Sequence, residues 1–155
     1  MPSYYPPVGF HFRVEFGFLA QESTDTLFQE VSGMSMSLGT EDYNEGGENR
    51  FAHRMPTMAK FSNLTLKRGL LADSQLITWI EHAVTNIEAG DEDNLKPTTV
   101  NVTLLNEKSE PVADTYSFVR AWPVKWAVSD FKSTDNSIVV ETLELSYNYF
   151  SRIQK

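Results

Sequence analysis

The sequence contains no cysteine, and this absence excludes several kinds of site. Without a thiol the chain cannot form a disulfide, a cysteine zinc cluster, an iron–sulfur centre or a thiol nucleophile. It also lacks any run of about 20 apolar residues, so we expect no membrane insertion by this chain. Residues 1–7 hold three prolines but neither the basic start nor the apolar stretch of a secretory signal. This start predicts no signal peptide, and folding in the cytoplasm of the cell that makes the chain.

Basic residues are scarce relative to acidic ones. The chain has 13 lysines and arginines against 21 aspartates and glutamates, which gives a formal charge of −8. Nucleic-acid binding depends on basic residues that neutralise phosphates and release their counterions. A net negative chain is unsuited to this, so we expect no static nucleic-acid binding. The length of 155 residues and the hydrophobic content of 41% predict one domain spanning residues 1–155 with a core of its own.

Alternating apolar residues predict several strands. The clearest alternation covers Phe10–Phe18, where five apolar residues alternate with four others, and it indicates a strand with one aromatic, buried face. A second strand is predicted over about 27–38, with a bulge or bend at Gly33. One or two strands are predicted between Phe51 and Leu71.

A single helix is predicted over about 73–89. Asp73 and Ser74 offer an N-cap, and Gly90 ends the pattern. Its apolar positions follow helical spacing: Leu76, Ile77, Ile80, Val84 and Ile87. This stripe is expected to dock on a sheet, because an isolated helix of this length is marginal in water.

The C-terminal part is again predicted to be β structure. A hairpin is predicted over residues 100–120, with its turn at Asn106–Pro111, and Pro123 predicts an edge or a bend. The final strand is predicted from Ile138 to Phe150. One of its faces is a polar row: Thr142, Glu144, Ser146 and Asn148. The fold class is therefore mainly β, an antiparallel β-barrel or two-sheet sandwich with one flanking helix.

Residues 39–51 are predicted to form a long extended loop, because they show no apolar periodicity and include four acids. Connections of this length usually carry function or become ordered against a partner, and the alternative is a solvated, mobile excursion. Gly46 and Gly47 lack the lysine-serine or lysine-threonine ending of a phosphate loop. They are better suited to a tight turn that approaches another backbone closely.

No pattern in the sequence predicts catalysis. The three histidines, His11, His53 and His82, show no metal-ligand spacing, and there is no Gly-x-Ser-x-Gly motif. The acids form no motif that would place two carboxylates across a substrate. We therefore predict a protein that is not an enzyme and has no catalytic residue, no metal and no cofactor.

Aromatic residues are abundant: three tryptophans, six tyrosines and ten phenylalanines. Such residues serve cores and interfaces alike, so a packed core is the simple interpretation. A small open β structure, however, leaves unpaired backbone groups at its strand edges. Ring closure with further copies of the chain is one way to satisfy them.

Five stretches, in this order and spacing, resemble contractile phage tail tube proteins and the inner tube proteins of phage-tail-like contractile injection systems. They are Phe28–Gly33, Glu45–Arg50, Leu66–Leu70, Ala121–Trp126 and Glu141–Leu145. The resemblance implies a β-barrel or sandwich that forms homohexameric rings, stacked into a hollow tube inside a sheath. It implies sheath, baseplate and tail-terminator proteins as partners, and a place in a phage tail or a released or cell-associated injection particle.

The resemblance also implies an extended loop that reaches the adjacent ring. The candidate residues for this inter-ring loop are Glu45, Gly46, Gly47, Glu48, Asn49 and Arg50. The loop's acids are expected to meet basic residues such as Lys67, Arg68 or Lys125 of a neighbour. The polar row of Thr142, Glu144, Ser146 and Asn148 suits a wetted lumen that passes DNA or protein effectors, with an ordinary solvent-facing strand as the alternative.

Three other functions stay open at this point. A type VI secretion tube protein shares the implied architecture. A monomeric β-barrel could bind a small apolar ligand in an aromatic interior. A hydrolase would use the scattered histidines and acids, and it would lose turnover on mutation of His53.

Overall fold

The structure is a computed structural model that describes residues 11–19, 24–44, 46–47, 50–90, 96–134 and 136–154. Antiparallel strands dominate these residues, and one α-helix accompanies them, which confirms the predicted fold class. No closed barrel forms within the described chain. The elements are β1 (Phe12–Phe16), the 3-10 turn η1 (Thr24–Thr26), β2 (Glu30–Ser32), β3 (Met36–Tyr43), β4 (His53–Phe61), β5 (Leu64–Gly69), α1 (Gln75–Glu88), β6 (Thr98–Leu105), β7 (Pro111–Val128), β8 (Val140–Ser146) and β9 (Tyr149–Ile153).

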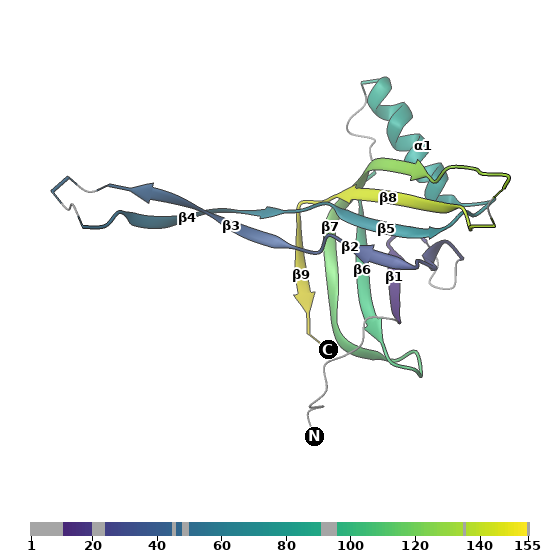
Figure 1. The fold of residues 1–155 in the computed structure, drawn as a ribbon, viewed down its shortest axis with the longest axis horizontal. Coiled ribbons are helices and arrows are strands. Elements are labelled where there is room, and N and C mark those ends of the chain that lie inside the picture. The colour runs from purple at the N-terminus through teal and green to yellow at the C-terminus, as the bar shows by residue number, and fades with distance from the viewer. Residues whose placement is uncertain are drawn as a thin grey trace.

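The long strand β7 belongs to two half-sheets. Its N-terminal part pairs with β6 and β9, and β1 follows β6. We call these strands the first half-sheet. From Trp122 onward β7 pairs with β8, which is followed by β5 and β2, and these strands form the second half-sheet. Figure 1 shows that the strands of the two half-sheets run across one another. The result is a sandwich whose corner is made by a shared strand.

The corner of β7 lies where Pro123 predicts an edge or a bend. Arg120 has a positive φ of 54°, and the register with β8 shifts between Pro123 and Lys125. Among the described residues, β7 pairs only with β8 beyond Ala121, so Pro123 lies on a strand with one free edge. A proline is tolerated here because its missing N–H interrupts no second ladder.

The hydrophobic core lies between the half-sheets and is covered by α1. It contains Val14, Phe16, Leu64, Leu66, Leu76, Trp79, Ile80, Val100, Val102, Phe118, Ala121, Leu143, Leu145 and Tyr147. The predicted strand over Phe10–Phe18 is confirmed for Phe12–Phe16, and Phe10 lies outside the described residues. Phe18 follows the strand and remains partly exposed, although it contacts the Trp79 ring.

The predicted helix is confirmed as α1. The Ser74 side chain caps it by accepting a hydrogen bond from the Ile77 N–H, and the helix ends at Glu88 before Gly90, whose φ is +74°. Leu76 and Ile80 in its N-terminal half are buried, whereas Val84 and Ile87 are exposed. The apolar stripe therefore docks for only half of its length. No helix among the described residues is both long and apolar enough to span a membrane.

The predicted β6–β7 hairpin is confirmed, but the single final strand is wrong. The chain breaks at Tyr147 and Asn148, so that β8 and β9 are separate strands. β8 pairs with β7 in the second half-sheet, and β9 pairs with residues Thr115–Val119 of β7 in the first. The Asn148 N–H donates to the Val119 carbonyl at this crossing. Apolar and polar residues alternate without interruption from β8 into β9, so the alternation did not show that the chain passes from one half-sheet to the other.

Candidate assembly surfaces

The predicted loop over 39–51 is in large part a β-hairpin, and this corrects the sequence interpretation. Residues Gly39–Tyr43 belong to β3, which pairs with β4 from Met36↔Phe61 to Tyr43↔His53. The predicted strand over 27–38 is correspondingly divided between β2 and the start of β3. The sequence concealed the hairpin because both of its faces are exposed, so no apolar alternation marks a buried face.

The β3–β4 hairpin projects from the body of the molecule, as Figure 1 shows. Its large apolar side chains are exposed: Met58 is 88% exposed and Leu38 65%, and Met36 and Met55 are similar. A two-stranded ribbon is at best marginally stable alone in water. Exposed apolar side chains gathered on one element mark an interaction surface. The hairpin is therefore a candidate surface for contact with another protein chain.

A set of short contacts fixes the base of the hairpin on the body. Gly33 has a φ of +84°, and a Cβ there would lie 2.1 Å from the Asn63 carbonyl oxygen, so only glycine fits this bend. The Ser62 hydroxyl lies 2.6 Å from the Ser35 hydroxyl and donates to the Gly33 carbonyl at 2.6 Å. The Tyr147 hydroxyl donates to the Ser62 carbonyl at 2.6 Å. These contacts hold the hairpin in one direction relative to the second half-sheet.

The predicted inter-ring residues lie at the hairpin tip. Gly46 and Gly47 are exposed, with nothing within 4 Å of a Cβ built on either. Arg50 is also exposed. The other candidates, Glu45, Glu48 and Asn49, lie outside the described residues.

Three residues of the predicted polar row share one face of β8. Thr142, Glu144 and Ser146 are half-buried and alternate with the buried Glu141, Leu143 and Leu145. Asn148 does not belong to this row, because it is exposed in the break between β8 and β9. On neighbouring strands Lys67 pairs with Thr142, and Thr65 and Lys125 pair with Glu144. The second half-sheet thus has a polar face directed away from the core.

In the two half-sheets, four strand edges are unpaired within the described part of the chain. They are the outer edges of β1 and β9 in the first half-sheet, and those of β2 and of Trp122–Val128 in the second. Unpaired edges present rows of backbone donors and acceptors that can pair with another chain. The second half-sheet therefore offers one open edge on each side, as continuation into a larger sheet requires.

A buried ionic cluster surrounds Arg68, whose side chain is only 2% exposed. Its Nε donates to Glu141 Oε2 at 2.8 Å, and its Nη1 donates to Asp25 Oδ1 at 2.9 Å. Its Nη2 donates to the Ser74 hydroxyl at 2.7 Å, and the guanidinium lies 5.4 Å from the Phe28 ring centroid. Arg68 is therefore unavailable to a neighbour's acidic loop, which corrects the expectation for this residue and leaves it untested for Lys67 and Lys125.

The carboxylate of Asp25 is tied to the start of α1. The Ser74 hydroxyl donates to Asp25 Oδ1, and the Gln75 N–H donates to Oδ2 at 2.8 Å. Burial raises the pKa of Asp25, but the hydrogen bonds from Ser74, Arg68 and Gln75 together lower it by more. The net result is a pKa below the ordinary value of 3.8. Ionised Asp25 thus helps to join η1, β5 and α1.

This lowered pKa predicts a dependence of stability on acid pH. Because the folded pKa of Asp25 is depressed, its contribution is fully present above the unfolded value near 3.8 and is lost as the pH falls through the folded pKa. In urea unfolding followed from pH 7 to pH 2, Asp25→Asn should be less stable than the wild type at neutral pH. The difference should begin to shrink only below about pH 4 and should be lost as the pH falls through the folded pKa of Asp25. A difference that does not change with pH would contradict this role.

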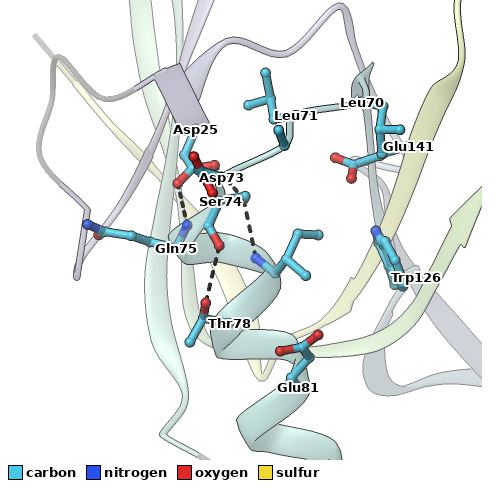
Figure 2. Close-up of a pocket in the computed structure, with 12 residues that line it drawn as sticks. Asp25, Leu70, Leu71, Asp73, Ser74, Gln75, Thr78, Glu81, Trp126 and Glu141 are labelled. Atoms are coloured by element: carbon cyan, nitrogen blue, oxygen red, sulfur yellow. Dashed lines mark hydrogen bonds between the residues drawn. The ribbon is translucent and has the colours of Figure 1, made fainter.

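A pocket of about 690 Å³ lies beside the cluster, between the start of α1 and the ends of β5, β7 and β8. Figure 2 shows the Glu141 carboxylate and the Trp126 side chain on one side and Ser74, Thr78 and Glu81 of the helix region on the other. Leu70 and Leu71 form a further part of its wall. Sequence analysis did not identify this pocket. Among the described residues, no three histidine or carboxylate side chains are grouped as metal ligands would be.

Comparisons with known proteins give consistent likenesses. The family model described as T4-like virus tail tube protein gp19 matches residues 8–151. A chain of the anti-feeding prophage (AFP) baseplate is 27% identical, with a TM-score of 0.80 over 98% of both chains. A search of curated proteins finds no match.

Two further solved structures share the fold at lower identity. A chain of the PVC sheath-tube complex, from an extracellular contractile injection system in its extended state, is 22% identical, with a TM-score of 0.78 over 98% of this chain and 94% of that one. Hcp1 from Flavobacterium johnsoniae is 13% identical, with a TM-score of 0.52 over 92% of this chain and 94% of that one.

Proposed function

The chain belongs to the T4-like virus tail tube protein gp19 family, and from this premise we propose that it is the structural subunit of the inner tube of a contractile injection particle or phage tail. In this proposal residues 1–155 act as one tail-tube domain. Six copies form a ring, and rings stack into a hollow, rigid tube. The protein is a structural component and not an enzyme.

The observation that carries the assembly part of the proposal is the open second half-sheet. Its two free edges, β2 on one side and Trp122–Val128 of β7 on the other, allow head-to-tail pairing between copies. A head-to-tail contact that closes by rotation makes a ring. The joined half-sheets would then form the wall of the lumen, and backbone hydrogen bonds would make that wall stiff.

The polar face of the second half-sheet suits the lumen surface. In the proposed ring, Thr142, Glu144 and Ser146 point into the channel, and Asn148 lies near the rim. Hydroxyl and carboxylate groups keep such a surface wetted, so cargo slides without apolar adhesion. The cargo is protein effectors or DNA, and the negative charge of the chain limits adhesion of either.

Mechanical work in this proposal comes from the sheath, and the tube is a passive piston. Sheath, baseplate and tail-terminator proteins are the expected partners. The β3–β4 hairpin is the element that reaches the adjacent ring, because it is exposed along its length and is held in a fixed direction at its base. Its candidate tip residues are Glu45, Gly46, Gly47, Glu48, Asn49 and Arg50. Assembly is expected in the bacterial cytoplasm, before release in the particle.

The experiment that tests this proposal is the oligomeric state of the purified wild-type chain. Sedimentation velocity should show a hexamer, and negative-stain electron microscopy should show rings that stack into hollow tubes as the concentration rises. A protein that stays monomeric at every concentration would overturn the proposal. That outcome would favour a monomeric binder of small ligands in its place.

A further inference from the structure

The pocket beside α1 lies at the end of the body opposite the β3–β4 hairpin. In Figure 1 the hairpin extends to the left along the longest axis, and the start of α1 and the end of β5 lie on the right. The pocket is lined there by Leu70, which follows β5, by the N-cap residue Ser74 and by Thr78 of α1. A chain with a projection at one end and a hollow at the other can contact a second copy head to tail, and such contacts stack without limit when they do not close.

The pocket contains an unsatisfied buried acceptor. Glu141 is only 3% exposed, and its Oε2 accepts from Arg68, but its Oε1 has no hydrogen-bond partner among the described residues. Figure 2 shows this carboxylate pointing into the pocket from β8. A buried carboxylate oxygen without a donor costs free energy, so a donor supplied from outside would be favourable here.

The charge of the pocket indicates what kind of donor it would take. Four lining residues are acids, Asp25, Asp73, Glu81 and Glu141. Arg68 pairs with Asp25 and Glu141 from beside the pocket, and its single positive charge does not balance the four carboxylates. Trp126 and Leu70 add exposed apolar surface beside these carboxylates. This combination suits a segment with cationic and apolar side chains, because a cation can pair with a carboxylate and also lie over an indole ring.

Strand β4 has this complementary chemistry. It carries His53, Arg54 and Lys60 and contains no acid. Arg54 is largely exposed and makes only a loose contact of 3.4 Å with Asp42. Between these cations lie Met55 and Met58, which are exposed and can pack against an apolar surface.

We propose that the pocket between α1, Trp126 and Glu141 receives β4 of a second copy in the adjacent ring. This inference rests on the proposed tube function and specifies the receptor for the hairpin. A cation of β4 pairs with the carboxylates of Glu81 and Glu141, and its methionines contact Trp126 and Leu70. The hairpin strand that docks is thus the basic one, and the surface that receives it is acidic.

Charge reversal on α1 tests this docking. Glu81 is exposed and lines the pocket, whereas Glu88 is exposed on the same helix and does not line it. Glu81→Arg should raise the concentration needed for ring stacking about tenfold or more, and Glu88→Arg should leave it unchanged. Adding Arg54→Glu to Glu81→Arg should restore stacking, because the pair of charges is then exchanged. Pelleting and electron microscopy measure these effects.

Cross-linking tests the contact directly, because the natural chain has no cysteine. Met58→Cys combined with Thr78→Cys should give intermolecular products with a short bismaleimide in assembled tubes. Thr85→Cys is the matched control, since Thr78 and Thr85 are both exposed on α1 and only Thr78 lines the pocket. The control pair should give little product.

The outcomes separate this docking from the tube function itself. Normal stacking by Glu81→Arg, or equal cross-linking of the Thr78 and Thr85 variants, would overturn the docking of β4 while wild-type tubes uphold the proposed function. A wild-type chain that forms neither rings nor tubes would overturn both.

Discussion

Replacing Arg68 with alanine is expected to lower the free energy of unfolding by about 3–5 kcal/mol. Arg68 donates to Glu141, to Asp25 and to Ser74 in a site with almost no solvent access. Its removal leaves two carboxylates buried without their cation, and such uncompensated charge is more costly than the lost attraction alone. Since small domains are stable by only about 5–15 kcal/mol, the variant should be close to unfolding.

Urea unfolding at neutral pH measures this effect, and Lys67→Ala is the matched control. Lys67 is the neighbouring residue on β5, and its contact with Glu30 is 3.5 Å long and about half exposed to solvent. Such a pair contributes less than about 1 kcal/mol. Equal losses for Arg68→Ala and Lys67→Ala would show that the cluster does not hold η1, β5, β8 and α1 together.

Removing the β3–β4 hairpin is expected to abolish tubes while leaving the body folded. Ser37 and Lys60 face each other in the ladder, so an Asn-Gly turn can join them in place of residues 38–59. The contacts at the hairpin base, including Ser35, Ser62 and Phe61 against Tyr147, are retained. Thermal unfolding of the shortened chain should stay within a few degrees of the wild type, because none of the described residues among those removed belongs to the core.

The assembly of the shortened chain distinguishes stacking from ring formation. Electron microscopy should show single rings and no tubes, since the open edges of the second half-sheet are untouched. A matched control replaces Glu107 and Lys108 with alanine in the exposed turn of the β6–β7 hairpin. This control should form normal tubes. Tubes of normal length from the shortened chain would exclude the hairpin from ring stacking.

Much of the fold could be predicted because a strand or helix with one buried face carries apolar residues at regular intervals in the sequence. Val14 and Phe16 alternate with polar residues in β1, and Ser74 and Gly90 bracket α1. The β3–β4 hairpin gave no such signal. Both of its faces are exposed, so apolar residues do not alternate with polar ones along most of its length. The only indication in the sequence was the length of the stretch without apolar periodicity.

The ionic cluster was predictable in principle from the same alternation. Arg68 shares a face of β5 with Leu64 and Leu66, and Glu141 shares a face of β8 with Leu143 and Leu145. A charge in phase with buried leucines on each of two strands indicates a buried pair. The sequence could not show that these strands are neighbours, nor that Asp25 joins them, because both depend on contacts distant along the chain. The pocket could not be predicted for the same reason, because its lining residues come from segments that are distant along the chain.

The continuity of β7 through both half-sheets has a mechanical consequence. Its 18 residues pass from one layer to the other without a loop, so the two layers are joined by covalent backbone as well as by side-chain packing. A load applied to the first half-sheet therefore travels to the second along a peptide chain, which hardly stretches. Under thrust, the layers of such a subunit move as one rigid piece and do not slide over each other.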